Sequence, residues 1–600
     1  MSVTPQNSDT SFGQVVDDPA ACAAETVLTM PTTLSPQDLA AQLETKYPLT
    51  VAALRQMEGG LLHLEYILNL EQRWKKVARG ENPLESEVLR YVPPEEMPEA
   101  DSEYDIVYCG GVLGLFSAAV MAQKGYRVAV FDQRRVGTSH REWNISDDEL
   151  LQFVEAGLFS QAEIEQAVAG RYQSGLISFY AGNIPEPPAE LLLEGVLDVA
   201  IDLSKLLELA RQKFEEAGGV CLDFHALKLV TITQSGPVRG LVEISDKSGQ
   251  TKRVGTRLVV NALGAISPLS LLLQGGKPFD GVCPTVGTTA SGFEVGPGPR
   301  QTNPGLGDVL VSVAHAQQGR QYIWEAFPGH AGEMTVYLFY YDLVRPGLAE
   351  NQSLLVLFEE YFRLLPTYKI PGPDFRHLKP VYGFIPARHH RPVASASRRG
   401  IISVGDATSP QSALTFCGFG SQVRNLPRLT RLLAFSLDHA LLEEKHLRSI
   451  GAHQHNISLA WVFSRFMSPY DAGKRPDDVN RMLNVFCAAL QQTGPGLTRR
   501  FFQDRFGWLD YNRLVLTTAW RAPRVFSFSL EVLGLGGIKD WISDYIRFSA
   551  DSLLRTLYRL YRRISPKGAN RLEKWLIPLA PALALKLAAH REEWAASGLK

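Results

Sequence analysis

The chain has 600 residues, which excludes a single small module and indicates several domain-sized units. Its 61 Lys and Arg residues nearly balance its 63 Asp and Glu residues, so a positive field over the whole surface that recruits nucleic acid is excluded. The hydrophobic fraction of 45% is that of a globular chain with a large core. The six cysteines are spaced too widely for a disulfide framework or a zinc ribbon, so we predict a reducing compartment and no metal site.

The first 92 residues divide into two segments of different composition. Residues 1–34 are rich in Ser, Thr, Gln, Asp and Pro without periodicity, and we expect them to be disordered. They show neither the basic and apolar regions of a signal peptide nor the arginines of a transit peptide, which indicates a bacterial cytoplasmic protein. Residues 35–92 are predicted to form a helical N-terminal extension, with Ser35 as the N-cap of its first helix. A proline-rich linker follows.

The main domain begins near Tyr104 with a strand, a glycine turn, a helix and a second strand that ends at Asp132. Asp202 is predicted to cap a later helix, and strands follow it. Alternating apolar residues predict an inserted β-sheet substrate domain at about 275–390, and residues 431–600 are predicted to be helical. The sequence therefore predicts an α/β fold with helical extensions at both ends. No window approaches 18 uninterrupted apolar residues, so no membrane-spanning helix is expected.

The turn after the first strand has the spacing of a dinucleotide-binding turn. Gly110 and Gly111 would let the backbone approach a pyrophosphate, and Gly114 would let the helix pack closely on the strand. Cys109 stands where the motif usually has its first glycine, which departs from the pattern. Asp132 ends the second strand, where a carboxylate binds ribose hydroxyls. The alternative is an ordinary strand-to-helix turn with a surface aspartate.

Two later segments resemble the remaining fingerprints of FAD-containing proteins. The segment 258–264 resembles the second fingerprint, with Asn261 where that motif usually has an aspartate, and ends at Gly264. The segment 399–407 resembles the third, in which an aspartate, here Asp406 after Gly405, bonds the ribityl chain of FAD. The resemblance implies an FAD-binding Rossmann-like domain of the glutathione-reductase and hydroxylase type over residues 104–430.

Three further segments resemble lycopene cyclases of the CruA/CruP type, within the superfamily that includes geranylgeranyl reductases. These segments are Arg-Glu-Trp-Asn-Ile-Ser at 141–146, Gly-Phe-Ile-Pro at 383–386 and Leu-Thr-Phe-Cys-Gly-Phe-Gly at 414–420. The resemblance implies an enzyme of carotenoid biosynthesis that converts linear lycopene to a β-ended carotene without net redox change. It also implies reduced FAD, NAD(P)H as the reductant, and a cyanobacterial source. A bound pigment is a further possibility under this resemblance.

Local sequence supports a site in two of these segments. A capping box at 146–149 places Arg141 and Asn144 just before a helix, where both can point into a cavity. Gly418 and Gly420 precede another helix, whose N-terminus would favour an anionic reduced flavin. The alternatives are a simple cap in the first case and a helix packed in the core in the second.

Three carboxyl groups are candidates for the proton donor in cyclisation. The glutamate pair of plant-type cyclases is missing, and aromatic residues stand in its place. Glu325 lies among aromatic residues that would raise its pKa and stabilise a cation, so it ranks first. Glu142 ranks second, and Asp342, expected to continue the strand that contains Tyr340, ranks third. Each can instead be a structural carboxylate.

The C-terminal helices are the candidate membrane contact. Residues 541–600 contain 11 Lys and Arg against 5 Asp and Glu, a net charge of +6. Leu553, Leu557 and Leu560 share one helix face with arginines beside it, and Trp575 follows. We therefore expect peripheral binding at the cytoplasmic face of a membrane, with docking of this helix on the catalytic domain as the equal alternative.

Two other functions remain open at the level of sequence. The same FAD fold supports a flavin-dependent reductase or monooxygenase acting on an isoprenoid or another lipid. A carotenoid- or pigment-binding paralogue with vestigial cyclase activity is the other, because the glutamate pair is missing.

Overall fold

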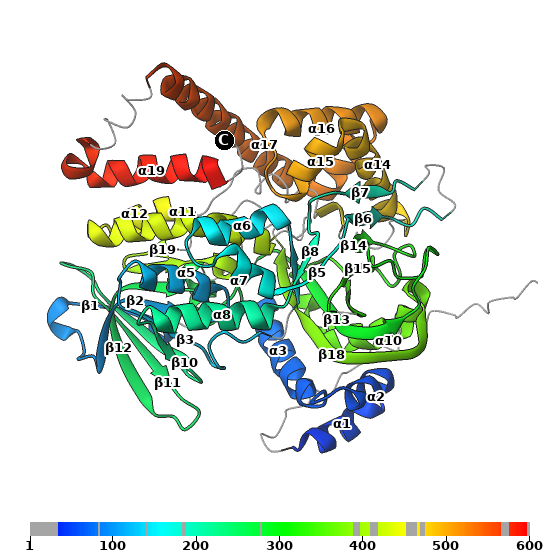
Figure 1. Cartoon of the computed structure of the whole chain (residues 1–600), viewed down its shortest axis with the longest axis horizontal. Helices are drawn as coiled ribbons and strands as arrows, with labels where there is room; N and C mark the ends of the chain where they lie inside the picture. Colours follow the sequence, from blue (N-terminus) through cyan, green and yellow to red (C-terminus); the bar gives the residue numbers. More distant parts are fainter. Residues whose placement is uncertain are drawn as a thin grey trace, which may run out of the picture.

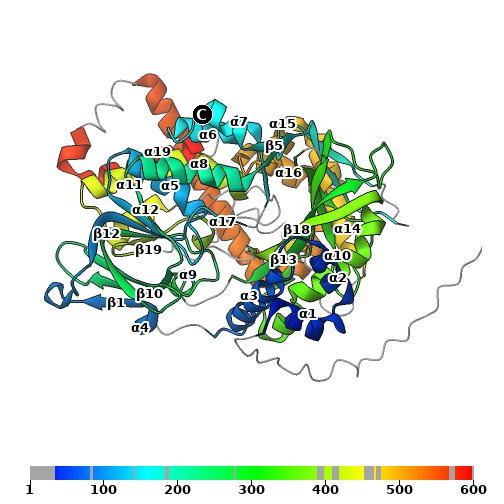
Figure 2. The same ribbon diagram turned by 60° about the horizontal axis from the view of Figure 1, so that its bottom comes forward.

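The computed structural model describes residues 34–81, 85–139, 142–182, 188–275, 279–330, 332–387, 397–408, 418–451, 465–467, 475–565 and 575–596. The expected disorder of the N-terminal segment falls on residues outside these ranges, apart from Leu34. Two large sheets stand side by side, each covered by helices (Figures 1 and 2). Among the described helices, none is long and apolar enough to cross a membrane.

The first sheet has nine strands in the order β1-β10-β11-β12-β2-β3-β9, and β20, which pairs with β19, lies against the end of β12. Strands β20, β12, β2, β3 and β9 run parallel, which is the arrangement expected of a Rossmann-like sheet. The strands are β1 (Leu89–Val92), β2 (Ser102–Cys109), β3 (Val128–Phe131), β9 (Val220–Leu222), β10 (Ala226–Thr233), β11 (Gly240–Ser245), β12 (Thr251–Asn261), β19 (Ser397–Arg398) and β20 (Ile401–Ser403). The predicted α/β fold class is confirmed.

The three segments that resemble FAD fingerprints end on neighbouring strands. Asn261, the last residue of β12, is in register with Cys109 of β2 on one side and Ser403 of β20 on the other. Cys109 is in turn in register with Phe131 of β3. The carboxyl ends of these parallel strands therefore meet at one edge, where open α/β sheets bind ligands.

Helices cover both faces of this sheet and connect its strands. Asp202 caps α8 by accepting a hydrogen bond from the Lys205 N–H at 3.0 Å, as predicted. The helices are α4 (Glu85–Val88), α5 (Leu113–Gln123), α6 (Asp147–Glu155), α7 (Gln161–Gln166), α8 (Leu203–Glu216), α9 (Pro268–Leu273), α11 (Gly418–Asp438) and α12 (Glu444–Ile450). A small sheet, β4 (Trp143–Ile145), β8 (Val199–Ile201) and β5 (Val168–Arg171), joins them to the second sheet.

The second sheet is mostly antiparallel, with the order β17-β13-β16-β15-β14-β6-β7 and β18 paired along β13. Its strands are β6 (Ser174–Ser178), β7 (Leu191–Leu193), β13 (Gly281–Phe293), β14 (Leu306–Val311), β15 (Ile323–Pro328), β16 (Glu333–Phe339), β17 (Asp342–Leu343) and β18 (Pro371–Ala387). β18 is one long strand, and 12 of its residues pair with β13. α10 (Leu354–Tyr368) lies against the sheet.

Side chains alternate across the second sheet, and this alternation directs Glu325 to the site. Trp324 and Ala326 of β15 pack with α10 and with the N-terminal helices α1 (Pro36–Glu44), α2 (Pro48–Gln56) and α3 (Leu62–Ala78). Ile323 and Phe327 belong to the cluster on the opposite side. Glu325 shares their side because neighbouring residues of a strand point to opposite faces.

The structure corrects three sequence expectations. The N-terminal extension is not wholly helical, because β1 pairs in parallel with β10 of the first sheet. The substrate sheet is not confined to residues 275–390, because β6 pairs with β14 and brings β7 with it. The strand expected to run through Tyr340 to Asp342 ends at Phe339, and Asp342 pairs separately with β13. All three depend on long-range strand pairing, which local periodicity does not encode.

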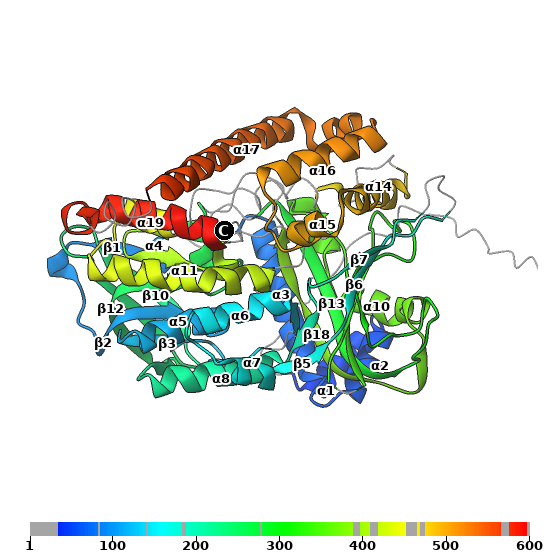
Figure 3. The same ribbon diagram turned by 45° about the horizontal axis from the view of Figure 1, so that its top comes forward.

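The C-terminal helices lie on the side of the molecule away from α1 and α2 (Figures 1 and 3). They are α14 (Asp478–Thr493), α15 (Pro495–Phe502), α16 (Trp508–Arg521), α17 (Val525–Ile564) and α19 (Pro581–Ala596). α14, α15 and α16 complete the second sheet's core, whereas α19 packs on α11 and α12. α17 contains a kink at Gly534 and packs on α16.

A buried ion pair joins α6 to α11. The Nε atom of Arg424 lies 2.8 Å from Oε1 of Glu149, and both side chains are almost completely buried. The other Glu149 oxygen accepts a hydrogen bond from the Ser146 N–H at 3.2 Å, as a capping-box glutamate does. A buried carboxylate without its cation is costly, so this pair fixes the two helices relative to each other.

Replacing Arg424 with leucine should lower the free energy of unfolding by about 3–5 kcal/mol at neutral pH, because Glu149 is then left buried without its cation. The loss should shrink in acid, where Glu149 takes up a proton. Urea unfolding at several pH values measures both effects. Arg448→Leu is the matched control, because its pair with Glu444 is exposed and contributes at most about 1 kcal/mol. Equal losses in the two variants would contradict this role of the buried pair.

Candidate functional site

The glycine positions at the turn between β2 and α5 leave no room for side chains. Gly110 has a φ of +106°, and a Cβ there would lie 2.4 Å from the carbonyl oxygen of Ala262. A Cβ on Gly111 would meet Val136 at 3.0 Å, and one on Gly114 would lie 2.9 Å from the Ala262 Cβ. The glycines therefore let α5 begin close to the strand ends, with its N-terminal N–H groups directed at that edge.

Asp132 follows β3 beside this turn. One carboxylate oxygen accepts a hydrogen bond from the Gly111 N–H at 2.9 Å, and the other accepts one from the Arg134 N–H at 3.0 Å. The carboxylate is thus held against the glycine turn by backbone donors. Its placement at the strand end fits the position from which an acid contacts ribose hydroxyls.

Asn261, at the aspartate position of the second fingerprint, ties the strand ends together. Its buried amide donates to the hydroxyls of Ser270 and Ser403, each at 3.0 Å, and its oxygen accepts from the Leu263 N–H at 3.3 Å. An amide both donates and accepts here, whereas an ionised aspartate only accepts. Gly264 then turns the chain with a φ of +85°. This substitution therefore has a structural explanation.

The third fingerprint leads directly to α11. Gly405 has a φ of +59° and opens a short 3-10 helix (Gly405–Thr408) that contains Asp406. The Gln422 amide of α11 donates to a carboxylate oxygen of Asp406 at 3.1 Å. Gly418 is the first residue of α11. Asp406 and the first turn of α11 therefore share one wall of the site.

Gly420 serves packing rather than the pocket surface. A Cβ at this position would lie 2.1 Å from a carboxylate oxygen of Glu149. The glycine thus admits the buried Glu149–Arg424 pair beside the first turn of α11.

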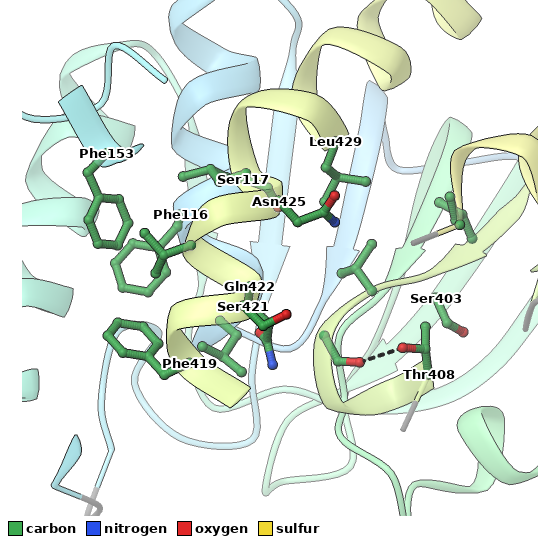
Figure 4. Close-up of a pocket in the computed structure, with 17 residues that line it drawn as sticks. Phe116, Ser117, Phe153, Ser403, Thr408, Phe419, Ser421, Gln422, Asn425 and Leu429 are labelled. Carbon is green, nitrogen blue, oxygen red and sulfur yellow. Dashed lines mark hydrogen bonds between the residues drawn. The ribbon is translucent and has the colours of Figure 1, made fainter. Parts of the chain in front are cut away.

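Two pockets adjoin at this edge, and Leu113, Phe419 and Gln422 line both. Figure 4 shows the first, where α5, β20 and α11 meet and the rings of Phe116, Phe153 and Phe419 gather on one side. On its other side the polar side chains of Gln422 and Asn425 come from α11. Its apolar wall and polar wall together suit a flat, amphipathic ligand.

The second pocket, called the acid pocket here, lies between the two large sheets. It brings Glu325, Glu142 and Asn144 together with Asp406 and Gly418. Its other lining residues are mostly apolar or aromatic: Leu113, Trp143, Thr285, Phe327, Tyr337, Tyr382, Gly383, Ile385, Pro386, Phe419 and Gln422. Parts of all three segments that resemble lycopene cyclases therefore line one pocket.

Glu325 is the most strongly perturbed acid of this pocket. Its side chain is buried, and burial raises its pKa to about 8, although the hydrogen bond from Asn144 opposes this rise. The Asn144 amide donates to Glu325 Oε1 at 3.2 Å. Since the pKa lies above 7, the carboxyl group holds its proton at neutral pH and can donate it in an apolar pocket.

Glu142 has a different environment in the same pocket. Its carboxylate forms an ion pair with the Lys379 ammonium of β18. Burial raises the pKa of Glu142 above its ordinary value, and the Lys379 ammonium offsets part of this rise. The backbone carbonyl of Glu142 accepts a hydrogen bond from the Tyr337 hydroxyl at 3.0 Å. The adjacent cation favours the ionised form, so Glu142 holds a proton less firmly than Glu325 and is less available as a donor at neutral pH.

Of the two remaining predicted residues, the structure describes Asp342. Asp342 does not line the acid pocket, and instead accepts hydrogen bonds from the Gln352 amide at 3.0 Å and the Leu343 N–H at 2.7 Å. Gln352 also accepts a hydrogen bond from the Trp74 indole at 3.0 Å, which links Asp342 to α3. Arg141 lies outside the described residues.

Several residues in or beside the pocket were not singled out from the sequence. Tyr382 lines the pocket and immediately precedes the Gly-Phe-Ile-Pro segment. Its hydroxyl shares a hydrogen bond with Nδ1 of His63 on α3, at 3.0 Å. Lys379 lies three residues earlier on the same strand. The segment at 383–386 was the available signal for both, because it marked this strand. Gln422 had no signal beyond its position in the helix after Gly420.

The strand edge fits a dinucleotide cofactor. The glycine turn, the carboxylate of Asp132 and the segment of Asp406 surround the ends of three parallel strands. These are the elements that would contact a pyrophosphate, a ribose and a ribityl chain. Within the described residues, no group of three or more His, Cys, Asp and Glu side chains is arranged to hold a metal ion.

No family model matches the sequence, and no curated protein matches it. Among solved structures, the chain is similar to a geranylgeranyl bacteriochlorophyll reductase-like protein from Thermoplasma acidophilum, at 14% identity and a TM-score of 0.50, over 72% of this chain and 99% of that chain. It is also similar to halogenase PltM in complex with phloroglucinol and FAD, at 14% identity and a TM-score of 0.49, over 82% of this chain and 98% of that one. Likeness at this identity shows the fold, which is the FAD-binding Rossmann-like α/β fold.

Replacing Glu325 with glutamine should stabilise the protein in alkali. The folded-state pKa of about 8 exceeds the ordinary value of 4.5, so the wild-type protein loses stability as the pH rises from about 4.5 to 8. The full loss is on the order of 4–5 kcal/mol, and glutamine does not incur it. Urea unfolding of both proteins across this range measures the difference. The two should be nearly equal at about pH 4.5, and parallel curves at all pH values would contradict the raised pKa.

Proposed function

We propose that the protein is an FAD-dependent lycopene cyclase. The observation that supports this proposal most is a buried, protonated Glu325 in an apolar pocket that also contains Asp406 and Gly418 of the cofactor segments. The substrate would be lycopene or a related linear carotenoid, and the product a carotene with one or two β-rings. The three segments that resemble lycopene cyclases all contribute to this pocket.

Cyclisation by this pocket would begin with proton transfer. Glu325 would give its proton to a terminal carbon–carbon double bond, and the neighbouring double bond would attack the resulting cation to close the ring. Loss of one proton from a ring carbon would form the final double bond. That proton would pass to the carboxylate left on Glu325, which would exchange it with water before the next turnover, so the enzyme returns to its starting state without net oxidation or reduction.

The residues around Glu325 would protect the cation during this sequence. Trp143, Phe327 and Tyr337 line the pocket, and the faces of aromatic rings attract cations. Asn144 would fix the direction of the Glu325 carboxyl group through its hydrogen bond. The apolar lining would exclude water, which would otherwise trap the cation as an alcohol.

The cofactor proposal rests on the strand edge described above. The glycine turn at 110–114, Asp132 and Asp406 would hold FAD, with Gly418 and the first turn of α11 beside the ring. When bound and reduced, with NAD(P)H as the proposed reductant, FAD would supply an electron-rich ring that stabilises the cation. A bound pigment would be an additional ligand of the same apolar pocket.

The Glu325→Gln variant should lose at least about 100-fold in lycopene turnover while keeping its FAD, because glutamine cannot donate the proton. Turnover is measured as cyclic carotene formed in lycopene-containing liposomes with reduced FAD. Glu333→Gln, on the neighbouring strand and outside the acid pocket, is the matched control and should keep its activity. Asp406→Ala should instead release FAD. Full turnover by Glu325→Gln would contradict the assignment of the acid.

The pH profile separates a proton donor from a structural carboxyl group. In the wild-type enzyme kcat/KM should fall above about pH 8, where Glu325 loses its proton. Asn144→Ala should move this fall to higher pH, because the Asn144 hydrogen bond lowers the pKa of Glu325. A product that gains two hydrogens would instead indicate the reductase alternative, and one that gains oxygen the monooxygenase. Lycopene that binds without reacting would indicate a pigment-binding protein.

A further inference from the structure

The exposed apolar side chains of the molecule gather on the C-terminal helices. On α16, Leu509, Leu516 and Trp520 recur at the spacing of one helix face and are strongly exposed, Trp520 at 86%. The opposite side of the same helix is buried, with Tyr511 and Leu514 in the core of the second sheet. α16 therefore has two apolar faces, and only one of them is covered by the protein.

The same pattern continues along α17. Ile546, Leu553, Leu557, Leu560 and Ile564 are all more than half exposed. Their spacing of three, four or seven residues places them on one face. That face extends from Leu535, which is 81% exposed, to Ile564. At about 1.5 Å per residue it is about 45 Å long.

The internal side of α17 is accounted for by contacts with α16. The Trp541 indole donates to the Tyr511 hydroxyl at 2.7 Å, and the Tyr545 hydroxyl donates to Asn512 at 2.7 Å. Phe548 is buried against Phe506. The exposed stripe is therefore a second apolar face of α17, separate from the face that packs on the rest of the protein. Single exposed leucines are ordinary, but a continuous stripe of this length marks an interaction surface.

The charges beside the stripe identify the kind of partner. Within residues 508–564 the structure describes every charged side chain except that of Arg562. Six of the described cationic side chains are exposed, whereas one acidic side chain, that of Glu531, is exposed. The exposed cations are Arg513, Arg521, Arg524, Lys539, Arg547 and Arg563. An apolar face flanked by cations, with an exposed tryptophan, is the pattern of a helix that lies in the interface of an anionic bilayer.

We propose that α16 and α17 form a docking surface for an anionic lipid bilayer, with the exposed leucine and isoleucine stripe in the acyl boundary and the arginines at the headgroups. α17 would lie along the membrane plane, since its apolar stripe follows the helix axis. Figure 3 shows that α16 and α17 lie together on one side of the molecule, away from α1. This surface is independent of the proposed chemistry, because it requires neither FAD nor a carotenoid.

The test is flotation of the full-length protein with vesicles of phosphatidylcholine containing about one-third phosphatidylglycerol. The wild-type protein should float with these vesicles, and less with pure phosphatidylcholine or at high salt. For the triple variant L553Q/L557Q/L560Q, the fraction of protein that floats with the vesicles should fall at least about fivefold, because three exposed leucines are removed from the stripe. Glutamine suits an exposed helix position, so the fold should be retained.

The matched control is L62Q/L151Q/L192Q, whose leucines have similar exposure but lie on other elements. It should float like the wild-type protein. Equal flotation of the two triple variants, or no flotation of the wild-type protein, would overturn the proposal. A dimer that L553Q/L557Q/L560Q disrupts, without any vesicle binding, would instead identify a second copy of the chain as the occupant. Binding is measured without turnover, so failure here is distinct from failure of the proposed cyclase activity.

Discussion

The acid pocket depends on a buried ion pair between two helices that are far apart in the sequence. Glu149 of α6 and Arg424 of α11 are both almost fully removed from water. α6 follows the strand that contains Asn144, and the first turn of α11 contains Gly418 and Phe419. By joining these helices, the pair fixes two walls of the pocket relative to each other. Gly420 makes this possible, because any side chain there would occupy the place of the Glu149 carboxylate.

A second constraint is the burial of Glu325 on an otherwise apolar strand face. The second sheet turns Trp324 and Ala326 toward α10 and the N-terminal helices, which leaves Glu325 on the opposite side, in the acid pocket. There its only described hydrogen bond is with the Asn144 amide, and no cation is paired with it among the described residues. Glu142 lies two residues before Asn144 and lines the same pocket, but it forms an ion pair with Lys379. The two carboxyl groups of this pocket thus have different environments, and Glu325 is the one that has no paired cation among the described residues.

The sequence predicted the parts of this site that depend on local pattern. The glycine turn after β2, the carboxylate that follows β3 and the strand containing Glu325 followed from spacing, alternation and neighbouring aromatic residues. The fold class followed from the order of these elements. Resemblance added the segments at 141–146, 383–386 and 414–420, parts of which line the acid pocket.

The remaining features depend on contacts between distant residues. The Lys379 partner of Glu142 and the Arg424 partner of Glu149 lie more than 200 residues away from them, and no local periodicity encodes such pairs. Asp342 was expected to share a strand face with Tyr340, but pairing with β13 and Gln352 places it elsewhere. From the sequence, the C-terminal apolar stripe was predicted only at Leu553–Leu560. The exposure of Leu516 and Trp520 on α16 depends on how that helix packs, which the sequence does not show.

The central claim is that this pocket adds a proton to a carotenoid end group and removes one, without net redox change. The direct measurement is the mass of the product formed from lycopene in deuterated water, without oxygen, in liposomes with FAD and NAD(P)H. The account predicts a cyclic isomer of lycopene with one solvent deuterium retained at carbon for each ring closed. A cyclic product without carbon-bound deuterium, or a product that has gained two hydrogens or an oxygen atom, would contradict it.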